Sequence, residues 1–156
     1  MLITRLLHRF PISGMFAYWL LFPAIYVYNA RTKTPRTRGI VVRDGKVLVV
    51  RNWFGRGEWS FPGGGRHRDE SELTALVREI KEEVGLSIDP QLAKHIATVR
   101  LSSYRSAFDV SVYRCCELRP LREPRRSLEI IDHRWVPITD LPADFTPELA
   151  TICKNL

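Results

Sequence analysis

The stretch "FPGGGRHRDESELTALVREIKEEVGLSI", residues 61–88, joins a glycine-rich loop to a concentrated cluster of negative charge. The three consecutive glycines at 63–65 form a backbone without β-carbons, which can approach a ligand closely. Three glutamates then follow within five residues: Glu79, Glu82 and Glu83. Like charges one helical turn apart repel, so this pattern costs stability unless another charge cancels it.

Residues 71–84 have the periodicity of an amphipathic helix. Apolar side chains recur at i, i+3, i+4, i+7 and i+11, namely at Leu73, Leu76, Val77, Ile80 and Val84. At about 100° per residue, the three glutamates fall in an arc beside this stripe. Gly85 stands where the C-cap is expected. The sequence therefore predicts a helix that buries one face and presents carboxylates on the next.

A hard divalent cation is the natural counter-charge for such a cluster. Oxygen ligands favour Mg²⁺, Mn²⁺ or Ca²⁺ over zinc or copper. The neighbouring glycine loop can offer carbonyls to a metal or amides to a phosphate.

Strand patterns surround this segment. Residues 39–52, "GIVVRDGKVLVVRN", predict a β-hairpin, because Asp44-Gly45 suits a tight type I′ turn. Further strands are predicted in "GEWSF", "KHIATVRL", "FDVSVYRCCEL" and "RWVPI", and a closing helix in "TPELATICKNL". Strands with helices between and after them predict an α/β or α+β sandwich.

The excess of positive charge lies at the N-terminus rather than in the main domain. The net charge is +7, with 24 basic and 17 acidic residues. Residues 1–38 hold six of the basic residues and no acidic one, which leaves 18 basic against 17 acidic residues in the other 118. The main domain is therefore close to neutral, and a partner for the charge is expected at the N-terminus.

Residues 10–30, "FPISGMFAYWLLFPAIYVYNA", carry no charge and are rich in aromatic side chains. We interpret residues 1–34 as a hydrophobic, basic, helical arm, and residues 35–156 as the main domain. Two hypotheses remain open for the arm. It either lies at a membrane interface, as its aromatic and basic residues favour, or packs on the domain or on a second subunit, which would give a homodimer.

Three cysteines without a C-x-x-C pair or an even framework predict a reducing compartment. The main domain is therefore expected to be cytoplasmic, with membrane association through residues 10–30 if the arm docks on a bilayer.

Residues 64–86 resemble the Nudix signature, G-x5-E-x7-R-E-U-x-E-E-x-G-U with U apolar, at every defined position. The matching residues are Gly64, Glu70, Arg78, Glu79, Ile80, Glu82, Glu83, Gly85 and Leu86. The preceding "WSFPGG" and the later "HRWVPITDLP" are also similar to Nudix domains, so the resemblance covers residues 38–150. It implies a Nudix α/β/α sandwich with a mixed sheet.

The resemblance also implies an activity, the Mg²⁺-dependent hydrolysis of a nucleoside diphosphate linked to another moiety X, with Mn²⁺ as a substitute ion. The metal ligands it implies are Glu79, Glu82, Glu83 and the carbonyl of Gly64. It gives Glu70 and Arg78 the task of orienting these ligands. The proton acceptor is left open between Glu79, Glu82 and a loop carboxylate, Glu129.

Substrate contacts are predicted outside the metal cluster. The candidates are Arg51, Gly63, Gly65, Arg66 and Tyr104. For each of the three side chains a structural role is an alternative to substrate binding. Arg51 would otherwise form a surface ion pair, Arg66 would be a solvated loop charge, and Tyr104 would serve strand packing.

Two other functions remain open. The first is a hydrolase of a lipid-linked diphosphate near a membrane, which the arm alone supports. The second is a Nudix fold that senses or binds a nucleotide, although such proteins usually lack some of the glutamates that are all present here. The near-neutral main domain disfavours an RNA substrate, so the expected partner is a small-molecule diphosphate and no nucleic acid polymer.

Overall fold

The computed structural model describes residues 35–52, 57–101, 108–125, 127 and 129–153. The predicted arm at residues 1–34 and the candidate Tyr104 lie outside the described residues, so their predicted roles remain predictions. Within the described ranges, neither helix has the length and apolarity needed to cross a bilayer.

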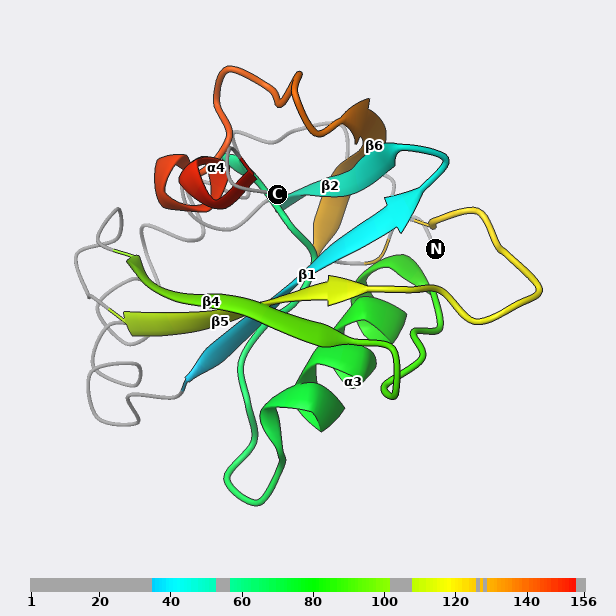
Figure 1. Ribbon diagram of the computed structural model, residues 1–156, viewed down its shortest axis with the longest axis vertical. Helices are drawn as coiled ribbons and strands as arrows, with labels where there is room; N and C mark the ends of the chain where they lie inside the picture. Colours follow the sequence, from blue (N-terminus) through cyan, green and yellow to red (C-terminus); the bar gives the residue numbers. More distant parts are fainter. Residues whose placement is uncertain (1–34, 53–56, 102–107, 126, 128, 154–156) are drawn as a thin grey trace, which may run out of the picture.

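The described strands form one mixed sheet (Figure 1). They are β1 (Arg36–Arg43), β2 (Lys46–Asn52), β3 (Trp59–Ser60), β4 (Lys94–Leu101), β5 (Phe108–Cys115) and β6 (Ile130–Pro137). The order is β3-β2-β1-β5-β4, and β6 pairs with β2 outside this path. β1 and β5 run parallel, whereas the other pairs are antiparallel, so the predicted mixed sheet is confirmed.

β1 and β2 pair only beside their turn, and the glycine segment fills the space beyond. Asp44 (φ 49°) and Gly45 (φ 72°) are both left-handed, as the predicted type I′ turn requires. Only Val42↔Val47 and Arg43↔Lys46 pair across the hairpin. Residues 59–65 pair first with β2 and then with β1, where two β1 amides donate to the carbonyls of Pro62 and Gly64 at 2.9 Å each. The sheet therefore holds the glycines in place.

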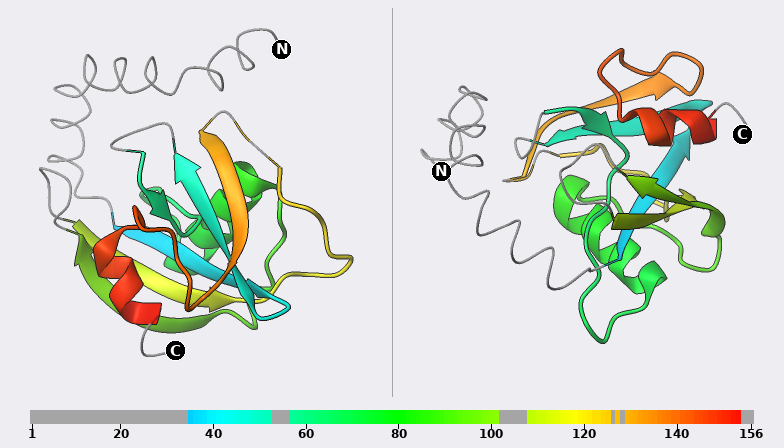
Figure 2. Two further views of the ribbon diagram at one scale, coloured as in Figure 1. Left: turned by 90° about the horizontal axis from the view of Figure 1, so that it is seen from above. Right: turned by 90° about the vertical axis from the view of Figure 1, so that its left-hand side faces the viewer.

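Two helices cover opposite faces of the sheet (Figure 2): α3 (Glu72–Val84) and α4 (Pro147–Cys153). Alternate residues of β1 and β2 separate into two cores. Ile40, Val47 and Val49 pack with α4 residues, whereas Val41 and Leu48 pack with α3 residues. The predicted α/β/α sandwich is therefore confirmed, with a core on each side of the sheet.

The limits of α3 follow from its caps. Ser71 accepts a hydrogen bond from the Thr74 amide at its N-terminus, and Gly85 ends it with φ 75°. The helix buries Ala75, Leu76, Ile80 and Val84, together with one charged residue, Glu83. One carboxylate of the predicted acidic arc thus lies within the buried face of the helix.

Candidate active site

Two of the three loop glycines are explained by close contacts. Gly63 has φ 133°, and a side chain there would collide with the β1 backbone at Thr37. At Gly64 a β-carbon would meet the carboxylate of Glu79 at 2.5 Å. A β-carbon at Gly65 would meet nothing within 4 Å. The loop therefore has no side chains at the two positions where β1 and the Glu79 carboxylate contact it.

Glu83 lies beneath this loop. Its side chain accepts a hydrogen bond from the Gly63 amide at 2.7 Å, and the residue is only 5% exposed. Burial raises the pKa of Glu83 to about 7, and repulsion from Glu79 and Glu129 acts in the same direction. The charge of Arg38 and the Gly63 amide oppose this rise in the pKa. Glu83 can therefore gain or lose a proton near neutral pH.

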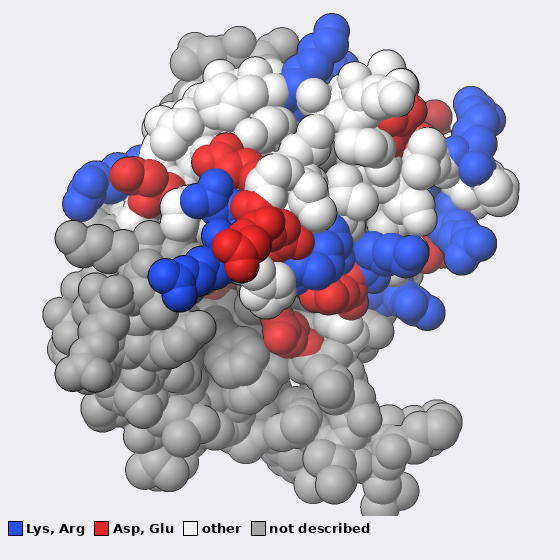
Figure 3. Space-filling model, turned by 90° about the horizontal axis from the view of Figure 1, so that it is seen from below, with Lys and Arg blue, Asp and Glu red and all other residues white. Residues whose placement is uncertain are grey.

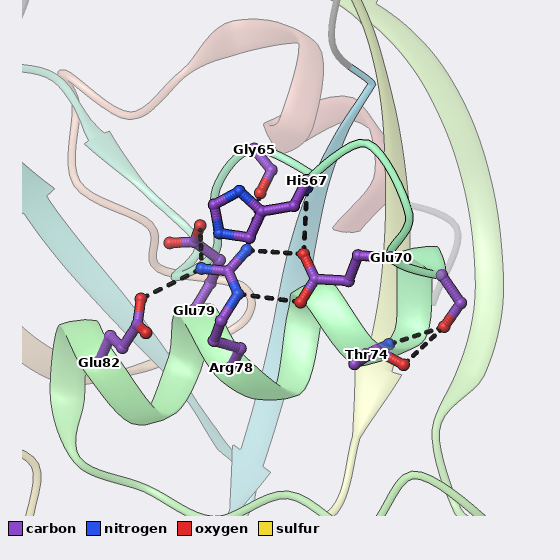
Figure 4. A network of polar contacts seen from close by, with 8 residues as sticks. Gly65, His67, Glu70, Thr74, Arg78, Glu79 and Glu82 are labelled. Atoms are coloured by element: carbon purple, nitrogen blue, oxygen red, sulfur yellow. Dashed lines mark hydrogen bonds and ion pairs between the residues drawn. The ribbon is translucent and has the colours of Figure 1, made fainter.

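Arg78 joins the acidic residues into one network (Figure 4). Its guanidinium holds Glu70 with two bonds of 2.9 Å, in the fork geometry that arginine offers a carboxylate. The same group donates to Glu79 at 2.8 Å, to Glu82 at 3.1 Å and to the Gly65 carbonyl at 3.0 Å. Arg78 thus partly neutralises the charge cluster, and it ties the helix to the glycine loop.

Glu70 remains charged in this network. Hydrogen bonds from Arg78 lower the pKa of Glu70 to about 2, and the backbone amide of His67 adds to the effect. Glu70 in turn raises the pKa of Arg78. The pair is a fixed ion pair at any physiological pH, suited to orienting neighbours rather than to moving protons.

Glu129 approaches the cluster from another element. It precedes β6, and the pKa of its carboxyl is raised by the protein that crowds it, then by repulsion from Glu79 and Glu82. The residue as a whole is exposed, so solvent still reaches it. The structure therefore brings together Glu79, Glu82, Glu83 and Glu129, although Glu129 is distant in sequence from the other three.

The segment before Glu129 is anchored at two points. Arg43 holds Glu117 with bonds of 2.9 and 2.7 Å and lies 4.5 Å from the ring centre of Trp135. Further along, the backbone amide of Arg125 donates to the Val84 carbonyl at the end of α3, at 2.9 Å. These contacts hold the chain in place at Glu117 and at Arg125.

The donor set suits a hard cation. Among the described residues, no group of three acidic, histidine or cysteine side chains is arranged to hold an ion as it stands. Arg78 donates to one oxygen of Glu79 and to one oxygen of Glu82, and each carboxylate has a second oxygen that can ligate a metal. The candidate ligands are all oxygens, and within the described residues the Gly64 carbonyl accepts one hydrogen bond, from the Thr37 amide, which leaves a lone pair. Such a set fits Mg²⁺ or Mn²⁺.

The predicted substrate contacts have partners within the protein. Arg51 forms an ion pair with Asp144 at 3.2 Å and donates to the Gly57 carbonyl at 2.5 Å. The backbone amide of Arg66 donates to Pro35 at 3.1 Å. The Gly63 amide bonds to Glu83, and the Gly65 carbonyl to Arg78. Their roles toward a substrate stay predictions.

Arg38 is a residue that the sequence patterns did not single out. In the sequence it is one of the six basic residues of the segment 1–38. Its Nε and Nη1 are buried and have no hydrogen-bond partner in the part of the chain that the structure describes. A charged residue directly before an apolar strand, "RGIVV", was the available signal.

The fold and the site define a family of hydrolases. The model of the NUDIX domain matches residues 33–156, most of the chain. The protein therefore belongs to the Nudix family, and the resemblance of residues 64–86 is confirmed.

Curated relatives that match this chain do so over about a third of its length. An RNA pyrophosphohydrolase of Teredinibacter turnerae is 45% identical over 53 residues, which cover 33% of this chain and 31% of the relative. The chain thus spans about a third of the length of the curated relatives it matches.

Solved structures match over a longer span. A MutT NUDIX hydrolase from Burkholderia pseudomallei has a TM-score of 0.70 and 23% identity, over 79% of this chain and 97% of that one. A Nudix family member from Chromobacterium violaceum has a TM-score of 0.61 and 25% identity, over 78% of this chain and 74% of that one. These matches support the fold of the domain.

Proposed function

We propose that the protein is a Nudix pyrophosphohydrolase that uses Mg²⁺ to hydrolyse a nucleoside diphosphate linked to another moiety X. The observation that supports this most strongly is the mutual repulsion of four glutamates, Glu79, Glu82, Glu83 and Glu129, with Glu79 against Gly64 and Glu83 buried. Like charges this close favour a bound cation. Family membership makes pyrophosphate hydrolysis the corresponding reaction.

Each group in the site has a proposed part in the reaction. The chemistry that Mg²⁺ supplies when bound is charge neutralisation on the diphosphate and a lower pKa for the attacking water. Glu79, Glu82, Glu83 and the Gly64 carbonyl would hold the ion. Glu70 would keep Arg78 in place, and Arg78 would orient the carboxylates that it contacts.

We assign the proton acceptor to Glu129. Arg78 hydrogen-bonds both Glu79 and Glu82, so each of these carboxylates already accepts a bond from a cation. Glu129 instead has a raised pKa and faces the same two carboxylates. A carboxylate that attracts protons more strongly is better suited to take one from water.

The residues of the site do not determine which diphosphate the enzyme hydrolyses. The named relatives act on RNA, whereas the near-neutral main domain favours a small molecule. Figure 3 agrees with the charge balance, since acidic side chains gather near the middle of the face it shows, with basic ones around them. We propose a small-molecule diphosphate as the main substrate, and we include RNA in the test.

The experiment is a Mg²⁺-dependent hydrolysis screen with the purified chain. The panel holds nucleoside triphosphates, ADP-ribose, other nucleotide sugars, dinucleoside polyphosphates, a prenyl diphosphate and a 5′-triphosphorylated RNA. Glu83→Gln is the blank, because it removes the ionisable ligand and keeps its shape. We expect turnover that EDTA and the blank both abolish. Equal turnover in the blank would refute the proposed metal site.

Glu129→Gln tests the proton acceptor in the same assay. We expect kcat to fall about a hundredfold, within the range that general base catalysis contributes, while the KM changes little. A kcat within twofold of wild type would return the role to Glu79 or Glu82.

A further inference from the structure

Arg38 lies on the α4 side of β1, directly beside the glycine loop. Side chains alternate along a strand, and Ile40 belongs to the core on the α4 side, so Arg38 points to that side as well. The neighbour on the open edge of β1 is Gly63, whose missing β-carbon would lie 3.1 Å from the Arg38 α-carbon. A side chain at Gly63 would collide with the β1 backbone, so the glycine allows the loop to lie directly against Arg38.

The guanidinium has unused donors. Its Nε and Nη1 are shielded from solvent, and no acceptor bonds to either of them within the described residues. Buried polar groups are almost always hydrogen-bonded, and a buried charge without a partner is strongly unfavourable. An arginine retained in this state is expected to meet an anion that binds later.

The neighbouring carboxylate does not fill this need. Glu83 lies near enough for the charge of Arg38 to lower its pKa. Its bonded oxygen, however, accepts from the Gly63 amide, and no hydrogen bond joins it to Arg38 among the residues described. Arg38 and Glu83 therefore flank Gly63, one with free donors and one with a ligand for a cation.

We propose that Arg38 is a substrate-binding residue that holds a phosphate group of the diphosphate, beside the metal ligands and across Gly63 from Glu83. The inference rests on the proposed function. Nε and Nη1 lie on different edges of the guanidinium, so each can donate to a phosphate oxygen, and the adjacent cation site suits the charge of a metal-bound diphosphate. The diphosphate would thus bind between the Arg38 guanidinium and the metal ion.

A purely structural role makes the opposite prediction for stability. If Arg38 served only as a counter-ion for Glu83, its removal would destabilise the free protein. If its donors wait for a ligand, its removal relieves an unsatisfied buried charge and leaves the free protein as stable or more stable.

The test compares wild type with Arg38→Met, Arg38→Lys and the control Arg100→Met. Arg100 is an exposed arginine on β4 that pairs loosely with Asp109 at 3.6 Å, so its loss removes one surface charge only. Binding of inorganic pyrophosphate is measured by calorimetry in EDTA at low ionic strength, where no turnover is needed. The Tm without ligand, and kcat and KM on the substrate found by the screen, complete the set.

We expect Arg38→Met to weaken pyrophosphate binding about tenfold or more and to raise the KM in parallel, with an unchanged or higher Tm. Arg38→Lys should keep part of the affinity, because it keeps the charge but loses the donors on two edges of the guanidinium. Arg100→Met should match wild type. Equal pyrophosphate affinity in wild type and Arg38→Met would overturn the inference, as would a lower Tm or failure of Arg38→Met to fold.

The two proposals fail separately. If wild type hydrolyses a diphosphate but Arg38→Met has the same KM and pyrophosphate affinity, the function stands and the role of Arg38 is refuted. If Arg38 is needed to bind pyrophosphate but no diphosphate is hydrolysed, the anion site is supported and the proposed reaction is refuted.

Discussion

Gly64 and Glu79 are in such close contact that a single added methyl group would separate them. A β-carbon at Gly64 would lie 2.5 Å from both the carboxyl carbon and Oε2 of Glu79, and 2.8 Å from Oε1. Real β-carbons do not approach other atoms so closely. The glycine loop and the acidic helix are thus one site, in which the absence of a side chain on one allows the carboxylate of the other to take its position.

Gly64→Ala is therefore expected to displace the Glu79 carboxylate, and to destabilise the metal-free protein by about 1 kcal/mol because the hydrogen bond from Arg78 to Glu79 is lost. In a Glu79→Ala background the methyl group has no carboxylate to displace, so the same change should cost less than about 0.5 kcal/mol. Denaturant unfolding in EDTA of the two single variants and the double variant measures the difference. An equal cost in both backgrounds would show that Gly64 is needed for its backbone conformation and not for Glu79.

The sequence predicted the elements on which this contact depends. The periodicity of residues 71–84 predicted α3, Asp44-Gly45 predicted the hairpin turn, and "KHIATVRL" coincides with β4. These signals are local, because each follows from the backbone preferences of a few adjacent residues.

What the sequence did not predict depends on tertiary contacts. β6 begins at Ile130, four residues before the predicted strand at Arg134, because pairing with β2 extends it along the sheet. The buried carboxylate of Glu83 and the unsatisfied donors of Arg38 follow from how the glycine segment crosses from β2 to β1. The periodicity of α3 or of β1 taken alone does not predict such a crossing.

Glu70→Gln should reveal the ion pair with Arg78 through its pH dependence. The folded-state pKa of Glu70 is about 2, below its ordinary value of 4.5, so the pair stabilises the fold above pH 4.5 and loses its effect as the pH falls toward 2. We expect the variant to be less stable by about 1–2 kcal/mol at pH 7, as for other hydrogen bonds to charged groups.

The free energy of unfolding, measured from pH 7 down to pH 2.5, checks this. The gap between wild type and Glu70→Gln should narrow as the solution becomes acidic. A gap that stays constant across this range would mean that the side chain stabilises the protein by packing and not by charge. Glu72→Gln, at the start of the same helix, serves as a control for the loss of one negative charge.

Glu83 should give the opposite pH dependence. Its folded-state pKa of about 7 lies above its ordinary 4.5, so the folded protein holds the proton more tightly. The metal-free protein is therefore favoured below pH 4.5 and loses stability as the pH rises through 7, by about 3 kcal/mol over the whole range. Glu83→Gln should lack this loss of stability, and its side-chain oxygen can still accept the hydrogen bond from the Gly63 amide.

Mg²⁺ extends this prediction, because a protonated carboxyl cannot ligate it. Titration with Mg²⁺ at pH 6 should release protons, and the affinity should rise between pH 6 and 8. Calorimetry in two buffers of different ionisation enthalpy measures the released protons. Binding without proton release at pH 6, and a stability in EDTA that is flat with pH, would each contradict the buried state of Glu83.

Gly85 and Gly45 form a matched pair that isolates the contact of Arg125 with the end of α3. Both glycines are left-handed, with φ of 75° and 72°, so Ala costs about 1 kcal/mol of backbone strain at either position.

A β-carbon at Gly45 meets nothing within 4 Å, whereas at Gly85 it would lie 2.6 Å from Nε of Arg125. Gly85→Ala should therefore displace the Arg125 side chain from the end of α3, where the Arg125 backbone amide donates to Val84. We expect Gly45→Ala to lower only the stability and Gly85→Ala to lower kcat about tenfold as well, within the effect of a misplaced catalytic group. Thermal unfolding and steady-state kinetics on both variants decide it, and equal kcat values would show that the Arg125 contact does not position Glu129.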